Sequence, residues 1–478
     1  MKPHLILDEQ SVAESRGVTF HLNPATKHRD NPVLLPGEPH EWDSLQVHWP
    51  GTVLYSPLDQ RFRCWYSGLD VVQSPNRHWL PGYAVSDDGV HWTKPKLDQV
   101  ILNGQRTNQL RPHWTDWPTN IPKPPWGAYL LSHVFENPLP DAPPEKRFGS
   151  LWWEATQPGA TGESIVRHRR KTLAFSPDGI HWNYECTPYE PGRDADKVFQ
   201  DVSQLLYDPE ERDPVFRVKG YSQVSRVRRW DGRPEVRHIG LVLGRDFNSL
   251  ANPPEPVVLA PQEGIDEELH FASVKKIGGS YLLLFESDRC SQNPVHGDLR
   301  LAVSDDGLRF RRIHPRTPLV ATGPKGSWDE RVLVTTTCAM QEVGDEVCIF
   351  YFGCPSIFNS WPVNYAVSCE RCGSLFSPNY LGLATLPRDR FAYATGDGTL
   401  TTHSLETGND GLWLNAEGDR LGVAALDGSG KPKARGHLGD ERRYTVYRKV
   451  VWNDSEPGGI GRLEITLTDG DKLFSVMY

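Results

Sequence analysis

Short apolar runs separated by polar turns rich in glycine and aspartate make up most of this chain. One phrase recurs: an apolar strand-like run, a turn with Asp and often Gly, and a second run that opens on an aromatic residue. Asp-Gly between two strand-like runs predicts a β-hairpin, because Gly accepts the positive φ of a tight turn. The copies are Tyr83–Trp92, Leu173–Trp182, Leu241–Phe247, Leu301–Phe310 and Leu383–Phe391.

A second hairpin precedes each copy of the first. Four of these upstream hairpins have the same length, and another has a longer, proline-rich turn. They cover Tyr55–Gly68, Phe135–Trp153, Tyr207–Gly220, Val274–Ser287 and Met340–Gly353. Two hairpins make a four-stranded unit, and five such units in alternating order predict a five-bladed β-propeller. The alternative is a large irregular β-sandwich, which leaves the repetition of both hairpins unexplained.

The expected blades have inner strands that begin near residues 47, 130, 201, 268 and 334. The 42 glycines and 40 prolines suit many turns, and no long run has apolar residues at helical spacing. The repeats end near residue 400. We therefore predict an all-β chain, with a propeller over residues 1–400 and a small C-terminal β-sandwich over residues 401–478.

The formal charge of −9 and the lack of a long basic block argue against a nucleic-acid-binding surface. No apolar run long enough to span a membrane occurs, and the first residues lack the apolar core of a signal peptide. A cytoplasmic protein without a membrane partner is expected. Cys354, Cys369 and Cys372 are candidates for a zinc site, but ordinary reduced thiols are favoured. No metal and no organic cofactor is predicted.

Two acids lie at equivalent places in successive predicted blades. Counting six residues back from the start of each equal-length hairpin reaches Trp49, Asp201, Glu268 and Val334. Because inner strands start near the axis of a propeller, Asp201 and Glu268 are expected to face one cavity. Glycoside hydrolysis needs two carboxyl groups, one to protonate the leaving oxygen and one to activate water or attack carbon. The alternative is that either acid holds a strand end through a salt bridge.

Further acids come just before two of the predicted inner strands. Glu41 and Asp43 precede the first inner strand, and Asp329 precedes the fifth. Each of these side chains is positioned to reach the axial pocket, as a catalytic or a substrate-binding group. Each can equally cap a turn, because carboxylates accept hydrogen bonds from nearby backbone amides.

Histidine and aromatic residues complete the expected pocket. His48 and His270 lie close to the same axis and are candidates to orient a carboxylate or bind a sugar hydroxyl, with Trp49 beside them. Trp117 and Tyr129 belong to an aromatic, proline-rich segment between the first two blades. That segment forms either a wall on which a sugar ring stacks or a plug over the mouth of the propeller.

Several phrases resemble the β-propeller glycoside hydrolases of families 32 and 43, the invertase, fructanase and arabinanase kind. They are Asn31–Leu34, Phe62–Tyr66, the Ser-x-Asp-Gly-x-x-Trp turns, Leu412–Asn415 and Val451–Trp452, which look like bacterial proteins labelled family 32 N-terminal-like. The resemblance covers nearly the whole chain. It implies a five-bladed catalytic propeller with a trailing β-sandwich and axial carboxylates. The invertase-type Asn-Asp-Pro motif has a different order here, Asp30-Asn31-Pro32.

The expected function is hydrolysis of an oligosaccharide or small glycoside, with furanosides among the candidate substrates. Glu268 is the expected general acid, because apolar Leu269 and Phe271 favour its protonated form, and Asp201 the nucleophile, base or charge stabiliser. Asp43 is the alternative to Asp201, since the resembling families place one catalytic Asp near the first blade. Two other functions stay open. One is a non-catalytic glycan-binding propeller, and the other a glycosyl-transferring enzyme or phosphorylase with a cationic cluster for phosphate.

Overall fold

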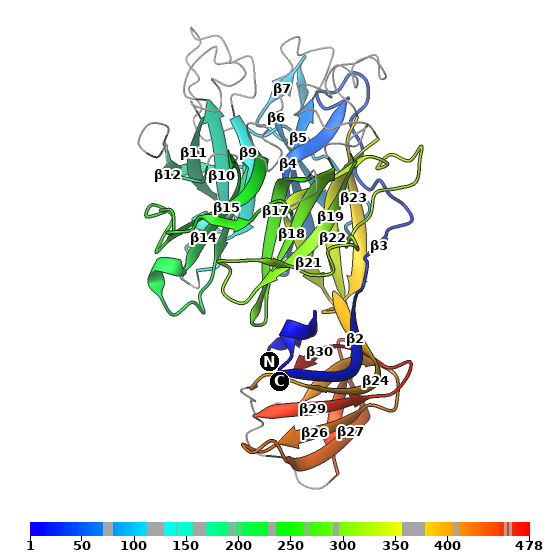
Figure 1. Ribbon diagram of the computed structural model, residues 1–478. Helices are drawn as coiled ribbons and strands as arrows, with labels where there is room; N and C mark the ends of the chain where they lie inside the picture. The colour runs from blue at the N-terminus through cyan, green and yellow to red at the C-terminus, as the bar shows by residue number, and fades with distance from the viewer. Residues whose placement is uncertain are drawn as a thin grey trace.

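The computed structural model describes residues 1–69, 80–111, 129–139, 141–155, 169–190, 194, 197–199, 202–227, 236–262, 267–289, 296–355, 378–405, 411–453, 457 and 461–478. Within these ranges the regular structure consists of strands and three single-turn 3-10 helices, so the expected all-β class is confirmed. None of the described helices is long and apolar enough to cross a membrane. Figure 1 shows a ring of sheets above a smaller sheet that contains the C-terminal residues.

The ring contains five groups of antiparallel strands among the described residues. The first consists of β4 (Gln46–Ser56), β5 (Arg61–Leu69) and β6 (Leu80–Ser86). The second consists of β9 (Tyr129–Glu136), β10 (Phe148–Ala155), β11 (Arg169–Ser176) and β12 (Asn183–Tyr189). The third consists of β13 (Ser203–Tyr207), β14 (Val218–Val227), β15 (Val236–Gly244) and β16 (Val257–Leu259).

The fourth group is β17 (Glu267–Ile277), β18 (Ser280–Arg289), β19 (His296–Ser304) and β20 (Arg311–Arg312). The fifth is β21 (Val332–Val343), β22 (Glu346–Cys354) and β23 (Tyr380–Pro387), with β3 (Thr26–Lys27) at its outer edge. A short hairpin of β7 (Ile101–Leu102) and β8 (Gln105–Arg106) follows the first group.

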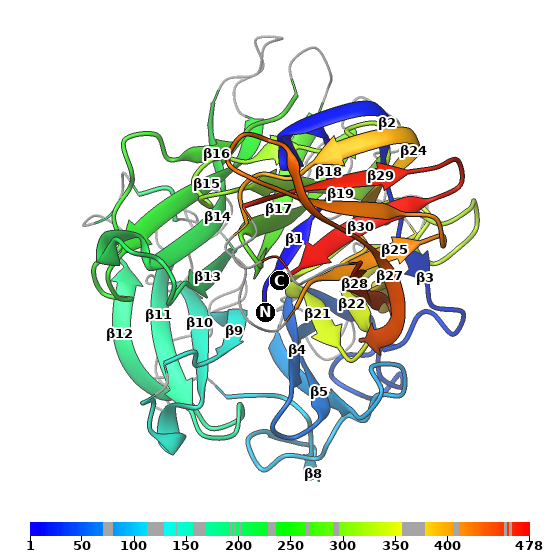
Figure 2. The same ribbon diagram turned by 90° about the horizontal axis from the view of Figure 1, so that it is seen from below.

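The first strands of the five groups contact one another in a closed circuit, from β4 through β9, β13, β17 and β21 back to β4. They begin at residues 46, 129, 203, 267 and 332, each within two residues of the start predicted from the hairpin repeat. Parallel pairs Gly297↔Val332 and Thr337↔Thr52 join neighbouring groups. These strands bring residues from distant parts of the sequence together around one centre, as Figure 2 shows from below.

Three of the predicted Asp-Gly turns adopt one local structure. In the first, Ser86 Oγ accepts a hydrogen bond from the Gly89 amide at 2.9 Å, and Asp88 Oδ1 accepts from the His91 amide at 2.8 Å. The glycine has φ of 78°, which only Gly adopts at little cost. The same contacts recur in Ser176–His181 and Ser304–Arg309. The repeated phrase in the sequence is therefore a repeated structural unit.

The lower sheet has nine strands in the described part of the chain. In hydrogen-bonding order they are β1 (Pro3–Leu5), β30 (Lys472–Met477), β25 (Trp413–Glu417), β28 (Tyr447–Trp452), β27 (Pro432–Arg443), β26 (Gly422–Leu426), β29 (Arg462–Leu467), β24 (Ala392–Thr401) and β2 (Glu14–Leu22). β24 also pairs with β30, through Ala394↔Leu473. The strands from β30 to β24 thus close into a barrel, where two packed sheets of a sandwich were expected.

The lower unit does not begin at residue 400, the predicted boundary. β1 and β2, inside the predicted propeller range 1–400, pair with β30 and β24 of the lower sheet. β24 itself starts at Ala392. Both ends of the chain therefore build this unit, because the edges of the C-terminal strands need partners that the local sequence does not supply.

Closure of the barrel depends on Gly396, where β24 passes from β30 to β29. Gly396 has φ of 135°, and a Cβ there would lie 2.5 Å from the Gly17 carbonyl oxygen. We expect Gly396→Ala to destabilise the protein by about 3 kcal/mol, from backbone strain and the clash. Gly428→Ala is the control, since a Cβ there meets nothing within 4 Å. Thermal unfolding of the full chain measures both, and equal melting temperatures would contradict the prediction.

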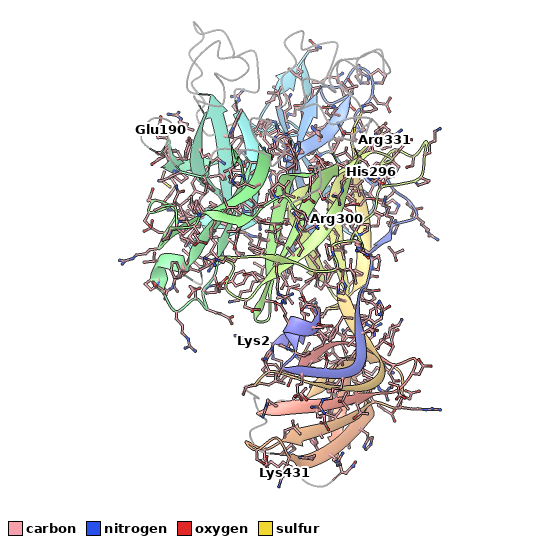
Figure 3. The ribbon with its side chains drawn as sticks, viewed as in Figure 1. Lys2, Glu190, His296, Arg300, Arg331 and Lys431 are labelled. Carbon is pink, nitrogen blue, oxygen red and sulfur yellow. The ribbon has the colours of Figure 1, made fainter. Side chains whose placement is uncertain are left out.

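Polar contacts join the ring to the barrel. Lys2 lies at the junction in Figure 3 and pairs with Glu210 at 2.5 Å. Tyr447 donates from its hydroxyl to Asp389 at 2.7 Å. Gly278, in the turn between β17 and β18, lies against Pro3 of β1. The start of β17 is therefore at the far end of the ring, roughly 30 Å from the barrel at about 3.3 Å per residue.

Candidate functional site: a buried carboxyl cluster

Buried charged side chains gather at the start of β17. Glu268 and His270 come from β17, and Glu286 and Asp288 come from its partner β18. Glu268 is directly opposite Asp288 in the antiparallel register, and alternate residues of a strand share one face. Arg237 comes from β15 of the neighbouring group, which lies beside β17 in both views (Figures 1 and 2). These five residues are termed the carboxyl cluster.

Polar contacts link the members of the cluster. His270 Nδ1 lies 3.8 Å from Glu286 Oε1 and 3.6 Å from Asp288 Oδ2. Arg237 Nη1 lies 3.8 Å from Glu268 Oε2, and the same nitrogen contacts His270 Nε2. The guanidinium therefore stands between one carboxylate and the imidazole, and the imidazole stands between the guanidinium and the other two carboxyls.

Gln223 of β14 holds Arg237 and His270 in place. In the amide orientation that satisfies both partners, its nitrogen donates to the His270 carbonyl oxygen and its oxygen accepts from Arg237 Nε at 3.1 Å. The amide thereby joins the third group of the ring to the fourth. This contact fixes the guanidinium relative to the start of β17.

Burial controls the protonation of the cluster. Glu286 is 0 % exposed, and both burial and the neighbouring Asp288 raise its pKa well above its ordinary value. Burial also raises the pKa of Asp288. Burial, and then the positive charge of Arg237, lower the pKa of His270 well below its ordinary value. The site therefore disfavours two adjacent carboxylates and an imidazolium.

Two of the residues predicted from the sequence, Glu268 and His270, are brought together in this cluster. Asp201 and Trp117 lie outside the described residues, so the pairing of Asp201 with Glu268 stays a prediction. Tyr129 begins β9, and its side chain is likewise outside what the structure describes.

His48 and Trp49 lie on β4, across the centre of the ring from β17. The Trp49 ring is 4.0 Å from that of Phe271, centroid to centroid, and Phe271 follows His270 on β17. His48 lies at the edge of Trp49, and burial lowers the pKa of His48 to about 3, so that its imidazole is neutral. An aromatic surface thus adjoins the carboxyl cluster.

Asp43 belongs to a different environment, inside the first group of the ring. Its carboxylate accepts a hydrogen bond from the Tyr66 hydroxyl at 2.6 Å and pairs with Lys94 at 2.6 Å. Trp42 stacks on the Tyr66 ring, with centroids 6.0 Å apart, and packs against Gly68. These contacts fasten the segment before β4 to β5, which is a structural role.

Asp329 repeats this arrangement in the fifth group. Its carboxylate pairs with Lys27 and accepts from the Tyr351 hydroxyl at 3.3 Å. Trp328 stacks on Tyr351 with centroids 5.8 Å apart. Two aspartates in the same setting, each before a first strand, indicate one repeated brace. We therefore correct the expectation that Asp43 or Asp329 delivers a carboxylate to the pocket.

Glu41 caps a turn. Its Oε2 accepts a hydrogen bond from the Glu38 amide at 2.8 Å, and the residue is exposed. Turn capping is the alternative role that was expected for an acid just before a strand. Among the contacts of the described residues, Glu41 has none with the carboxyl cluster.

The brace predicts the effect of a substitution at Asp43. Asp43→Asn should destabilise the protein by about 3 kcal/mol, because it removes one partner of a buried ion pair and leaves the Lys94 ammonium uncompensated. Asp87→Asn is the control, since Asp87 is exposed and exposed pairs contribute little. Denaturant unfolding measures both. A folded Asp43→Asn protein of parental stability would contradict the structural role.

The sequence-based expectations missed Glu286, Asp288 and Arg237. The first two follow the apolar run of β18, at a spacing of two residues that puts both on one face of a strand. Acids at that spacing at the end of a buried strand are a usable signal. Arg237 has no such local signal, because its partners come from another group of the ring.

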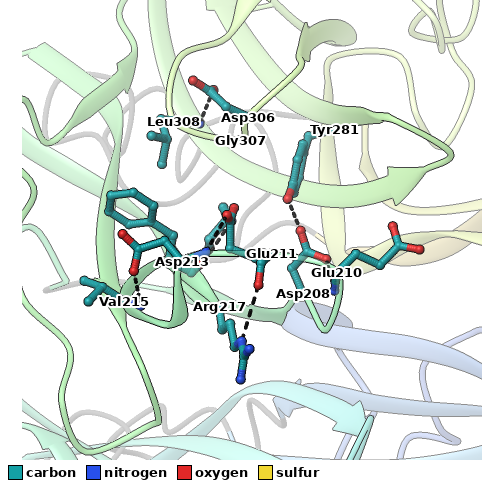
Figure 4. A network of polar contacts seen from close by, with 12 residues as sticks. Asp208, Glu210, Glu211, Asp213, Val215, Arg217, Tyr281, Asp306, Gly307 and Leu308 are labelled. Carbon is teal, nitrogen blue, oxygen red and sulfur yellow. Dashed lines mark hydrogen bonds and ion pairs between the residues drawn. The ribbon is translucent and has the colours of Figure 1, made fainter.

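A cavity of about 630 Å³ lies at the opposite end of the ring, next to the barrel. Several of its charged side chains pair with one another, such as Lys276 with Asp208 at 2.9 Å. Figure 4 shows Tyr281 donating to Asp208, on a turn where Asp213 caps a short 3-10 helix by accepting from Val215 at 2.9 Å. These acids stabilise the turn, and the arrangement differs from that of the carboxyl cluster.

Comparisons with known proteins gave no match to a family model and no match to a curated protein. Several solved structures are similar in backbone. One described as a glycoside hydrolase has 13% sequence identity and a TM-score of 0.49, covering 76% of this chain and 92% of its own. An N-acetylgalactosamine deacetylase from F. plautii has 18% identity and a TM-score of 0.44, covering 77% and 96%. A β-1,2-mannobiose phosphorylase from Listeria innocua has 10% identity and a TM-score of 0.44, covering 76% and 96%.

Proposed function

We propose that this chain is a carbohydrate-active enzyme that hydrolyses a glycosidic bond in an oligosaccharide or small glycoside. The observation that carries the proposal is the carboxyl cluster, in which Glu268 is opposite Asp288 and beside the Arg237 guanidinium at one end of the ring. Glycoside hydrolysis needs one carboxyl group as proton donor and one carboxylate as base or nucleophile. Carboxyls on neighbouring strands suit that chemistry, and the nearby Trp49 offers an apolar face for a sugar ring.

We interpret the ring as a five-bladed β-propeller in which each antiparallel group is one blade. The closed circuit of first strands supports this interpretation, as does the agreement between the observed strand starts and the hairpin repeat. In a propeller the starts of the inner strands surround one mouth. The proposed substrate site is that mouth, where β17 begins.

Within the proposal, Glu268 acts as base or nucleophile. Arg237 supplies a positive charge 3.8 Å from its carboxylate, which suits a group that must be negatively charged before it accepts a proton or attacks carbon. This reverses the role of general acid expected from the sequence. Asp201 then takes the part of proton donor, an assignment that rests on hairpin register. Asp43 is left out, because Lys94 and Tyr66 bind its carboxylate.

The experiment is incubation of the purified full chain with a panel of aryl pyranosides, aryl furanosides and oligosaccharides, with released sugar measured by chromatography. Release above the rate in buffer supports the proposal. Binding of a sugar without cleavage would overturn it in favour of a glycan-binding protein. Cleavage that requires inorganic phosphate and yields a sugar phosphate would overturn it in favour of a phosphorylase.

A further inference from the structure

Three side chains of the carboxyl cluster have the chemistry and spacing of metal ligands. One ligand atom from each of His270, Glu286 and Asp288 lies within 4.8 Å of the other two. From His270 Nδ1, the carboxylate oxygens are 3.8 and 3.6 Å away, too far for hydrogen bonds. A cation about 2.1 Å from each ligand atom fits between atoms at such separations.

The state of Glu286 is an independent indication of a ligand. The residue is 0 % exposed, and neither carboxyl oxygen accepts a hydrogen bond from any described residue. Two costs follow if Glu286 is charged: its carboxylate is buried without a hydrogen bond from a described residue, and a second carboxyl, Asp288, is its neighbour. A positive charge placed between them removes both costs.

We propose that His270, Glu286 and Asp288 bind one divalent transition-metal cation, of the Mn²⁺ or Zn²⁺ class. Two carboxylates and one imidazole nitrogen are a donor set typical of these cations, whereas Ca²⁺ and Mg²⁺ prefer oxygen ligands throughout. The ligands lie on two hydrogen-bonded strands, so the site is rigid before the cation binds. The inference does not depend on the reaction assigned to Glu268.

Cation binding has a consequence for Arg237. A cation on Nδ1 requires the proton of the His270 ring to be on Nε2, and an N–H group there no longer accepts from the guanidinium. Arg237 then loses its contact with His270 and keeps Glu268, 3.8 Å away, as its partner. The cation and Arg237 therefore compete at His270, and occupation of the site directs the guanidinium to Glu268.

The test is titration of the chelator-treated full chain with Mn²⁺, with free Mn²⁺ followed by its electron paramagnetic resonance signal. We expect one Mn²⁺ per chain. Glu286→Gln keeps the size of the side chain and should weaken binding at least tenfold, an order of magnitude typical of damage to a metal site. Glu255→Gln is the control, because it removes an exposed carboxylate from a loop of the same ring and should leave binding unchanged.

Thermal unfolding separates loss of the site from loss of the fold. Mn²⁺ should raise the melting temperature of the parent protein and not that of Glu286→Gln. If Glu286→Gln does not fold, Asp288→Asn takes its place with the same expectations. A parent protein that binds no Mn²⁺ or Zn²⁺, or a folded variant that binds as tightly as the parent, would overturn the proposal. Cation binding without glycoside cleavage would overturn the proposed function and leave this inference intact.

Discussion

Glu268→Gln should reduce the rate of hydrolysis of a responsive glycoside by about 10³-fold while the protein remains folded. The amide has the shape of the carboxyl group but neither accepts a proton at neutral pH nor attacks carbon. Arg237 keeps its contacts with Gln223 and His270, so the surroundings of the substituted residue persist. Turnover numbers and thermal melting curves of the parent and the variant measure the two parts of this expectation.

Glu267→Gln is the matched control, since Glu267 precedes Glu268 on the same strand. Its carboxylate pairs with Arg312 at 2.8 Å and accepts from Ser287, on the opposite face of the sheet. This variant should lose stability and keep its turnover to within about tenfold of the parent, because a structural ion pair does not act on the reacting bond. Equal turnover losses in the two variants would mean that Glu268 acts through the fold and not in the reaction.

The parts of the fold that local sequence determines were predictable. Each Ser-x-Asp-Gly turn closes through hydrogen bonds between residues two or three apart, as from Gly89 to Ser86, so its geometry is encoded where it occurs. The hairpins on either side follow from these turns and from the alternation of apolar and polar residues along the strands. That is why the inner strands could be located to within two residues.

Closure of the lower barrel was not predictable in this way. β1 joins β30 through pairs such as Pro3↔Met477, which connect the two ends of the chain. β24 divides its length between β30 and β29, and the change depends on the conformation of Gly396. Contacts between such distant segments leave no periodic signal, and a short strand reads the same in a sandwich and in a barrel.

The candidate acids also show what local sequence predicts and what contacts between distant segments decide. Register along β17 located Glu268, because the hairpin repeat fixes which residues begin a first strand. Asp43 and Asp329 also precede first strands, yet each is bound by a lysine and a tyrosine that the sequence places far away. Whether a buried acid is free to react depends on these partners. A list of acids in register therefore reduces the number of candidate catalytic residues. It does not identify which of them is catalytic.

The charge balance of the carboxyl cluster connects the two proposals. Three carboxyls and one imidazole lie around the guanidinium of Arg237, which contacts both Glu268 and His270. Without another positive charge, burial keeps carboxyls of the cluster protonated, as the raised pKa values of Glu286 and Asp288 indicate. A bound cation would neutralise that pair and leave Arg237 to Glu268. The cation would thereby favour the charged form of the carboxylate that the proposed reaction uses.

Arg237→Met should have two opposite effects, about 100-fold slower hydrolysis and at least about tenfold tighter Mn²⁺ binding. Hydrolysis falls because Glu268 loses a positive charge beside its carboxylate, and removal of one fixed electrostatic group costs a reaction about this much. Mn²⁺ binding tightens because the guanidinium no longer competes for His270 and no longer repels the cation at short range. Turnover and Mn²⁺ titration of the same preparation measure both effects.

Arg237→Lys separates charge from geometry in this prediction. Lysine keeps a positive charge near the cluster but lacks the planar fork that reaches Gln223 and His270 together. Its Mn²⁺ affinity should stay closer to that of the parent than the affinity of Arg237→Met. If Arg237→Met instead binds Mn²⁺ more weakly and melts at a lower temperature with and without the cation, Arg237 supports the fold at the start of β17. The expected tightening of Mn²⁺ binding would then be contradicted.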